Sequence, residues 1–304
     1  MTSNETSDLS DIKANDWVDR WFSPMIRPYL RLARLDRPVG IWLVLFPCIA
    51  ALFQASHGWP APKETLIFCL GAFLMRSAGS TINDIADRNF DAHVERTRHR
   101  PLANGKVTTQ KAVFFFIAQL LSAASLLYFL TPYTRIMALV VLPLVIIYPF
   151  CKRFTHWPQA VLGAAFNWGM LMVWAEIDGH IPIGALLMWL GAVAWQIGYD
   201  TVYAYVDVRD DSQIGIKSTA LLFGKYGKTC ITFFYISAVV LWACGGWLIG
   251  MKPLYAVVMI FTAAHLLWQV WQLDLKKPSL SFNLFMHNIL TGIFLAIATL
   301  AGTI

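Results

Sequence analysis

Two groups of acidic side chains stand out in a chain that is otherwise poor in charge. The first lies in the stretch TINDIADRNFDAH, where Asn83, Asp84, Asp87 and Asp91 follow directly on an apolar run. On a helix that turns by 100° per residue, the three carboxylates fall within about 60° of one another, and Asn83 lies one turn before Asp87. A continuous helix would therefore gather four oxygen-bearing side chains on one face.

The second group lies in the stretch YDTVYAYVDVRDD. If this segment is also helical, Asp207 and Asp211 fall about 20° on either side of Asp200, whereas Asp210 points about 80° away. Capping and solvation at a helix end would explain a single aspartate. Aspartates near a helix C-terminus oppose the helix dipole, so two aligned groups favour a functional site.

Carboxylates held close together repel one another unless a cation binds between them. Oxygen donors from Asp and Asn are hard ligands that suit Mg²⁺ rather than Zn²⁺, and no His or Cys joins either group at ligand spacing. Mg²⁺ usually takes one or two carboxylates and completes its shell with water and phosphate oxygens. We therefore expect a magnesium site that holds a polyphosphate.

Basic residues follow both acidic groups along the chain. Their guanidinium and ammonium groups could hold phosphate oxygens directly, although some serve only to fix membrane topology. These residues are Arg96, Arg98, Arg100 and Lys106 after the first group, and Lys217 and Lys225 after the second.

The composition places these groups in a membrane protein. Hydrophobic residues make up 57% of the 304 residues and charged residues 14%, whereas ordinary soluble domains carry about 25% charged residues. Nine apolar runs can each be extended to the roughly 20 residues that a spanning helix needs. Because lipid offers no partner for unpaired backbone groups, we expect an all-α, polytopic bundle of nine transmembrane helices.

The loops of this nine-span arrangement carry very different amounts of positive charge. Nearly all of the 24 Lys and Arg residues fall on one side; the exceptions are Lys63, Arg135 and Lys252 outside, and Arg76 within the second span. Positive charge marks the cytoplasmic side, so the N-terminus is expected inside and the C-terminus outside. Both acidic groups then emerge on the cytoplasmic side, where they could face each other across a cavity. Arg76 is expected to be an internal ion-pair partner.

The same distribution fits a protein of the bacterial cytoplasmic membrane. The N-terminal residues are polar and acidic, unlike a signal or transit peptide. The net charge of +6 suits anionic lipid headgroups and requires no nucleic acid as a partner. We expect a cytoplasmic segment with an interfacial helix over residues 1–37, and the transmembrane domain over residues 38–304.

The two acidic stretches resemble the aspartate-rich motifs of the UbiA superfamily of intramembrane prenyltransferases. The first matches NDxxDxxxD through all four of its residues. The second is similar to DxxxDxxxD through Asp207 and Asp211, but Tyr203 stands four residues before Asp207, which leaves the role of Asp200 open. The resemblance covers almost the whole chain, including RLDRPVGIWLVLFP and YPFCKRFTHWPQAVLGAAFNWG.

This resemblance implies a helix bundle around a central cavity, dependence on Mg²⁺, and transfer of a polyprenyl group from its diphosphate to an aromatic ring. The stretches RLDRPVG and CKRFTH look most like the branch that prenylates 4-hydroxybenzoate for ubiquinone biosynthesis. The expected metal ligands are Asn83, Asp84, Asp87, Asp91, Asp200, Asp207 and Asp211, of which Asp84, Asp87, Asp207 and Asp211 are expected to be catalytic. The expected substrate-binding residues are Arg37, Asn83, Arg96, Arg100, Lys152, Arg153, Tyr203 and Lys217.

The acceptor and the class of protein leave alternatives. An arginine fork suits the carboxylate of an aromatic acid, and Arg153 is favoured over Arg37 for that contact. Another acceptor, such as homogentisate, a naphthoate or haem, would share the same diphosphate site. A divalent-cation transporter is the alternative from another class, but it predicts acids near the middle of the membrane. Prenyl chain length and oligomeric state are not predicted.

Overall fold

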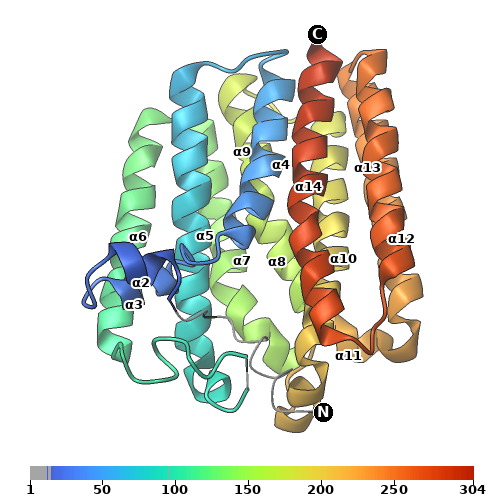
Figure 1. Cartoon of the computed structure of the whole chain (residues 1–304). Coiled ribbons are helices and arrows are strands. Elements are labelled where there is room, and N and C mark those ends of the chain that lie inside the picture. Colours follow the sequence, from blue (N-terminus) through green and yellow to red (C-terminus); the bar gives the residue numbers. More distant parts are fainter. Residues whose placement is uncertain (1–11, 13–14, 95) are drawn as a thin grey trace. The chain divides into compact units, whose positions relative to one another are not determined.

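Helices are the only regular elements in the part of the chain that the structure describes. The computed structural model describes Ile12, residues 15–94 and residues 96–304 (Figure 1). Most of the N-terminal polar stretch, including Lys13, and also Glu95, lie outside the described residues. The all-α prediction is confirmed.

The chain forms two compact units, which are described separately. The first comprises the described residues of Met1–Ile41 and Phe73–Ser125, and the second comprises Trp42–Ala72 and Leu126–Ile304. The first unit contains α2 (Trp17–Trp21), α3 (Arg27–Leu32), most of α5 (Pro62–Asp91) and nearly all of α6 (Thr109–Leu126). The second contains most of α4 (Val39–Ala55), η2 (Leu127–Phe129), α7 (Pro132–Phe154), α8 (Pro158–Phe166), α9 (Trp168–Ile177), α10 (Ile183–Ile214), α11 (Thr219–Phe223), η3 (Gly224–Tyr226), α12 (Gly227–Ile249), α13 (Pro253–Gln272) and α14 (Pro278–Thr303).

Several helices are suited to cross a membrane. Seven helical segments of the described chain are long and apolar enough to do so, and α4 is a shorter apolar helix. The remaining predicted span is α10, which continues from an apolar start into the second acidic group. The chain is a multi-pass membrane protein.

Proline and glycine mark many of the helix ends. The helices α7, α13 and α14 each begin with a proline, where the missing N–H leaves no intrahelical bond unmade. The helices α10 and α12 end at Gly215 and Gly250, which have φ angles of 73° and 81°. Glycine adopts this left-handed conformation without the steric penalty of a side chain.

A small apolar core holds the first unit together. Leu32 of α3, Ile85 of α5 and Ala112 of α6 are buried in one cluster with Val107, and Tyr29 packs against it. The cluster thus fixes the C-terminal end of α3 against the C-terminal part of α5.

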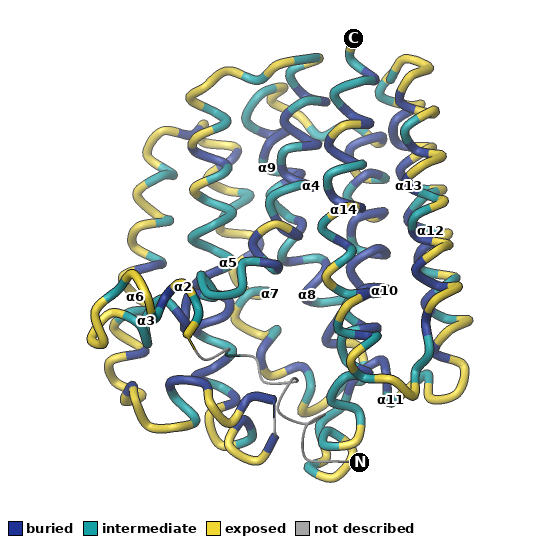
Figure 2. The backbone as a smooth tube through the Cα atoms, in the orientation of Figure 1, coloured by how far each residue is buried: buried dark blue, intermediate teal, exposed yellow. Residues whose placement is uncertain are grey.

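In the second unit, α10 packs tightly against α12. Figure 1 shows α10, α12, α13 and α14 running side by side, and the middle of α10 is buried in Figure 2. Gly184 and Gly191 lie two turns apart on the face of α10 that contacts α12. A Cβ added to Gly184 would lie 2.8 Å from the carbonyl oxygen of Gly245 in α12. Small residues at such positions let two membrane helices approach closely.

A chain of buried polar side chains joins α10, α13 and α14. The indole N–H of Trp195 donates to Asn288 Oδ1 at 2.8 Å, and Asn288 Nδ2 donates to Gln269 Oε1 at 2.9 Å. Gln269 Nε2 in turn donates to the hydroxyl of Thr291 at 3.3 Å. Such interhelical hydrogen bonds fix the register of helices where apolar packing alone is not specific.

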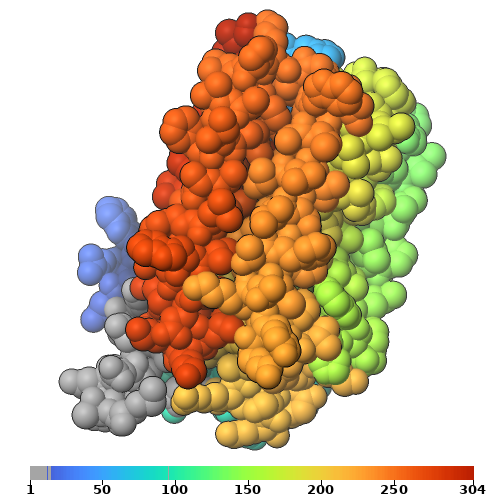
Figure 3. Space-filling view, turned by 90° about the vertical axis from the view of Figure 1, so that its right-hand side faces the viewer, coloured from blue at the N-terminus to red at the C-terminus, as the bar shows by residue number. Residues whose placement is uncertain are grey.

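The outward faces of α12 and α13 carry large apolar side chains. Figure 3 shows this surface over α12 and α13. Its exposed side chains include Phe233, Ile236, Val240 and Trp247 of α12, and Ile260, Phe261 and Trp271 of α13. An apolar surface of this extent fits contact with lipid.

The close contact between α10 and α12 predicts a loss of stability in Gly184→Ala. The new Cβ would overlap the backbone of α12, so the helices must move apart; we expect a destabilisation of about 1–3 kcal/mol. The measurement is the thermal unfolding midpoint of the purified protein in detergent. Gly71→Ala is the matched control, because its Cβ would meet only Leu126 Cδ1 at 3.9 Å. Equal midpoints for the two variants would contradict the inferred contact.

Candidate active site

The first acidic group occupies the last turns of α5. The helix runs without interruption to Asp91, so the predicted helical spacing of Asp84, Asp87 and Asp91 is confirmed. These side chains are buried, and Asp84 has no exposed surface. Asn83 Nδ2 donates to Asp87 Oδ2 at 3.0 Å, one helical turn away, as its position predicts.

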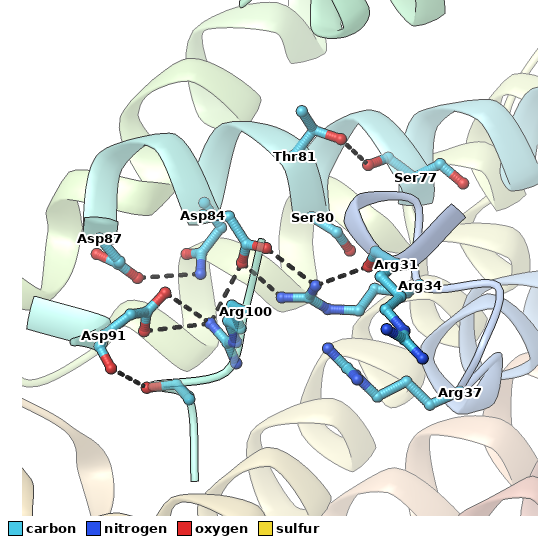
Figure 4. A network of polar contacts seen from close by, with 12 residues as sticks. Arg31, Arg34, Arg37, Ser77, Ser80, Thr81, Asp84, Asp87, Asp91 and Arg100 are labelled. Atoms are coloured by element: carbon cyan, nitrogen blue, oxygen red, sulfur yellow. Dashed lines mark hydrogen bonds and ion pairs between the residues drawn. The ribbon is translucent and has the colours of Figure 1, made fainter. Parts of the chain in front are cut away.

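Two arginines neutralise this group. Arg34 donates from both terminal nitrogens to the two oxygens of Asp84, with 3.0 Å between Nη1 and Oδ2. Arg100 Nη1 lies 3.2 Å from Asp84 Oδ1 and 3.0 Å from Asp91 Oδ2, so it bridges two carboxylates. Figure 4 shows Asp84 between the two guanidinium groups. Such partners offset the cost of placing a carboxylate in a buried position near a helix C-terminus.

The loop after α5 brings Arg100 back to the helix that precedes it. The Thr97 hydroxyl donates to the backbone oxygen of Asp91 at 2.9 Å, which folds the loop against the end of α5. Arg96 and Arg100 are both buried in this loop, whereas Arg98 is exposed. Arg96 and Arg100 thus lie in the same unit as the first acidic group, and their role in holding phosphate stays a prediction.

Arg34 was missed as a site residue by sequence reasoning, which treated it as a topological charge. No helical spacing relates it to Asp84, because it lies in the turn between α3 and α4. The Ser77 hydroxyl of α5 donates to the carbonyl oxygen of Ala33 at 3.2 Å and ties this turn to α5. Arg76, the expected ion-pair partner, donates to the hydroxyl of Ser80.

Arg37 lies in the same turn and contacts its neighbour. Its Nη1 donates to Asp36 Oδ2 at 2.8 Å. Burial raises the pKa of Asp36, and the guanidinium groups of Arg37 and Arg34 oppose that shift. Oδ1 of Asp36 is buried without a hydrogen-bond partner among the described residues, so the turn carries a polar group that is not fully satisfied.

The second acidic group lies on the last turns of α10 in the second unit. The helix continues to Ile214, so Asp200, Asp207 and Asp211 share one helical stripe, as predicted. All three and Asp210 are half-buried. The predicted opposition of the two acidic groups across one cavity stays a prediction.

Basic residues of the second unit meet just beyond α10. The backbone N–H of Lys217 donates to the carbonyl oxygen of Lys152 at 2.9 Å, and Lys217 Nζ donates to the carbonyl oxygen of Phe154 at 3.3 Å. Lys152 and Arg153 form the last turn of α7, and the Arg153 guanidinium lies 5.1 Å from the centre of the Phe150 ring. The chain therefore brings together Lys152, Arg153 and Lys217, which are distant in sequence.

Tyr203 lies one turn before Asp207 on α10 and is half-buried. Its ring lies 4.5 Å from that of Phe285 and 6.3 Å from that of Phe282, both on α14. Three aromatic rings thus adjoin the second acidic group. The sequence indicated only the spacing of Tyr203 to Asp207, not the contacts with α14.

The donor chemistry of both groups fits Mg²⁺. Their side chains supply carboxylate and amide oxygens, which are hard ligands. Among the described residues of the first unit, no three Asp, Glu, His or Cys side chains converge at metal-binding distance. This is compatible with Mg²⁺, which usually takes one or two carboxylates and fills its shell from water and phosphate.

Comparison with known proteins identifies the family. Residues 44–297 match the UbiA prenyltransferase family, and the match includes both acidic groups. The chain belongs to this family. One UbiA-type relative is the 4-hydroxybenzoate octaprenyltransferase of Hydrogenovibrio crunogenus, which is 41% identical over 92% of this chain and 98% of its own length. A mitochondrial 4-hydroxybenzoate polyprenyltransferase from Dictyostelium discoideum is 38% identical over 92% of this chain and 61% of its own length.

A solved UbiA structure supports the fold. A UbiA homologue from Archaeoglobus fulgidus bound to GPP and Mg²⁺ has a TM-score of 0.71 at 20% identity, covering 90% of this chain and 98% of its own. At this identity the likeness concerns the fold of the UbiA family, and it confirms the predicted architecture.

The double contact of Arg100 predicts that Arg100→Gln destabilises the metal-free protein. Its removal would leave Asp84 and Asp91 with less compensation in a buried position, for which we expect a loss of about 3 kcal/mol. The thermal unfolding midpoint measured in EDTA tests this. Arg98→Gln removes an exposed charge from the same loop and should leave the midpoint nearly unchanged. A loss no larger than that of Arg98→Gln would contradict the role of Arg100.

Proposed function

We propose that this protein transfers a polyprenyl group from polyprenyl diphosphate to 4-hydroxybenzoate in the pathway to ubiquinone. The main support is that a relative named 4-hydroxybenzoate octaprenyltransferase aligns with this chain over nearly its whole length at 41% identity. The two aspartate-rich helix ends support it, because each is an oxygen-rich site accompanied by basic residues.

The diphosphate end of the substrate would be held by both acidic groups through Mg²⁺. The metal ligands we propose are Asn83, Asp84, Asp87, Asp91, Asp200, Asp207 and Asp211. Bound Mg²⁺ would neutralise the charge that develops on the leaving diphosphate. Arg96, Arg100 and Lys217 would bind phosphate oxygens that the metal leaves open. The support for Mg²⁺ is the donor chemistry of these residues and the Mg²⁺ bound by the homologue from Archaeoglobus fulgidus.

The reaction needs stabilisation of negative charge at the diphosphate and a water-free environment around the prenyl chain. When the allylic C–O bond breaks, its electron pair leaves with the diphosphate, and the ring carbon ortho to the hydroxyl of 4-hydroxybenzoate forms a C–C bond to the allylic carbon. That ring carbon then loses its proton to a base, which restores aromaticity. Cleavage of the C–O bond leaves positive charge on the allylic carbon. A site among apolar helices keeps water from this allylic cation and admits a long prenyl chain.

The carboxylate of 4-hydroxybenzoate requires a cationic partner, for which we propose Arg153. A guanidinium fork matches the geometry of a carboxylate better than an ammonium group. Arg153 is exposed at the end of α7 and close to Lys217 and Lys152. Tyr203 would line the adjoining part of the site, and Arg37 and Lys152 would contact either substrate.

We further propose that the protein lies in the bacterial cytoplasmic membrane with its N-terminus inside and its C-terminus outside. The uneven distribution of Lys and Arg supports this orientation. The segment before the first span would lie at the membrane interface, because Trp21 at the end of α2 and Met25 between α2 and α3 are 80% and 84% exposed.

A direct test is to incubate membranes that contain the protein with a labelled polyprenyl diphosphate, Mg²⁺ or EDTA, and a panel of acceptors. The panel contains 4-hydroxybenzoate, homogentisate, a naphthoate and haem. We expect a Mg²⁺-dependent product from 4-hydroxybenzoate. A product from another acceptor alone would reassign the substrate, and Mg²⁺ transport into vesicles without any prenylated product would favour a transporter.

The proposed metal ligands predict that Asp87→Asn and Asp207→Asn each lower turnover by about 100-fold or more, since each removes a charge that faces the metal. The measurement is the rate of prenyl transfer by membranes that contain equal amounts of folded protein. Asp274→Asn is the charge-matched control, because Asp274 is 41% exposed in the loop before α14 and pairs with Lys277. Activity within twofold of wild type in either site variant would show that the metal ligands are misplaced.

The proposed role of Arg153 predicts a selective effect on the acceptor. Arg153→Gln should raise the KM for 4-hydroxybenzoate by about tenfold, the equivalent of one lost charge-assisted hydrogen bond. The KM for polyprenyl diphosphate should change little. Lys276→Gln removes an exposed positive charge elsewhere and serves as the control. A rise in the KM for the diphosphate alone would move Arg153 to the other substrate.

A further inference from the structure

Arg34 follows α3 in a backbone conformation that arginine rarely adopts. Its φ angle is 60°, in the left-handed region. The N–H of Leu35 donates to the carbonyl oxygen of Leu30 at 3.0 Å, and the N–H of Arg34 to that of Arg31 at 3.1 Å. This is the hydrogen-bond pattern in which glycine usually follows the helix. A residue with a Cβ is sterically disfavoured there, so its side chain must contribute something that glycine would not.

The side chain of Arg34 makes a two-pronged contact with Asp84. The Arg34 side chain is 12% exposed, and the Asp84 side chain is fully buried. Nη1 also donates to the backbone oxygen of Arg31 at 3.1 Å, which locks the guanidinium to the turn that carries it. Hydrogen bonds therefore link the turn, the Arg34 guanidinium and the Asp84 carboxylate, as Figure 4 shows.

This contact competes with a metal ion. Both oxygens of Asp84 already accept hydrogen bonds from Arg34, and Oδ1 accepts a further one from Arg100. A cation that approaches Asp84 meets two positive groups at short range, and Coulomb repulsion is strong where water is excluded. Binding of a metal alone would therefore require at least one guanidinium group to leave Asp84.

We propose that Arg34 is a positioning residue that orients Asp84 and couples metal binding to diphosphate binding. This inference rests on the proposed function. Without substrate, the fork of Arg34 holds the Asp84 carboxylate in one orientation but opposes a free cation. Diphosphate supplies anionic oxygens to which the displaced guanidinium can turn, so metal and diphosphate bind better together than either does alone.

The test measures metal binding without turnover. The full chain in detergent is titrated with Mn²⁺ in place of Mg²⁺, with and without geranyl thiolodiphosphate, an unreactive diphosphate analogue. The electron paramagnetic resonance signal of free Mn²⁺ reports binding, after subtraction of a protein-free blank that contains the analogue. For wild type we expect the analogue to raise Mn²⁺ affinity by about tenfold, within the usual range of coupling between sites.

The decisive variant is Arg34→Gly, because glycine suits the left-handed position and the turn should still form. We expect it to bind Mn²⁺ alone about fivefold more tightly than wild type and to lose most of the coupling to the analogue. Arg34→Lys keeps the charge but not the fork, and should show intermediate coupling. Arg27→Gln is the matched control, because Arg27 belongs to α3, the helix that precedes Arg34, and pairs with Asp19 rather than with Asp84.

The outcomes separate this inference from the proposed function. Two outcomes would contradict the role proposed for Arg34 while the proposed function stands. In the first, wild type shows coupling and Arg34→Gly retains it. In the second, Arg34→Gly binds Mn²⁺ alone more weakly than wild type does. If wild type binds neither Mn²⁺ nor the analogue and gives no prenylated product, the proposed function fails as well.

Discussion

The structure of the first unit depends on compensation of buried negative charge at the end of an apolar helix. Asp84, Asp87 and Asp91 crowd the C-terminus of α5, where the helix dipole and the low dielectric both disfavour carboxylates. Arg34, which precedes α5 in the chain, and Arg100, which follows it, supply the opposite charge. The turn before α4 and the loop after α5 are both shaped by the need to deliver these groups.

Compensation by arginine differs from compensation by metal in one respect. A guanidinium group is attached to the chain, so it accompanies the buried acidic group whether or not a metal is bound. The second acidic group is less buried than the first, and its aspartates lie beside a loop whose Lys217 contacts backbone oxygens of α7. The two groups thus differ in their surroundings: ion pairs compensate the first, and the second has greater access to solvent.

Periodicity and composition were enough to predict the helices and the grouping of the aspartates. Apolar runs located the membrane helices, and the spacing of the aspartates placed them on common faces because α5 and α10 are continuous. The ion pair of Arg34 could not be predicted, since no sequence pattern indicates an arginine with a positive φ angle. The hydrogen bond between Lys217 and Lys152 could not be predicted either, because it joins backbone groups and does not depend on the type of side chain.

Helix length is what allows charge and lipid to coexist in this chain. The two helices that carry the aspartates, α5 and α10, have 30 and 32 residues, which correspond to roughly 45 and 48 Å at 1.5 Å per residue. The hydrocarbon layer of a bilayer is only about 30 Å thick. Each helix is therefore longer than the hydrocarbon layer is thick, and the aspartates occupy its last turns. Inserting one residue before the aspartates would advance them by about 1.5 Å and rotate them by about 100°, away from their partners.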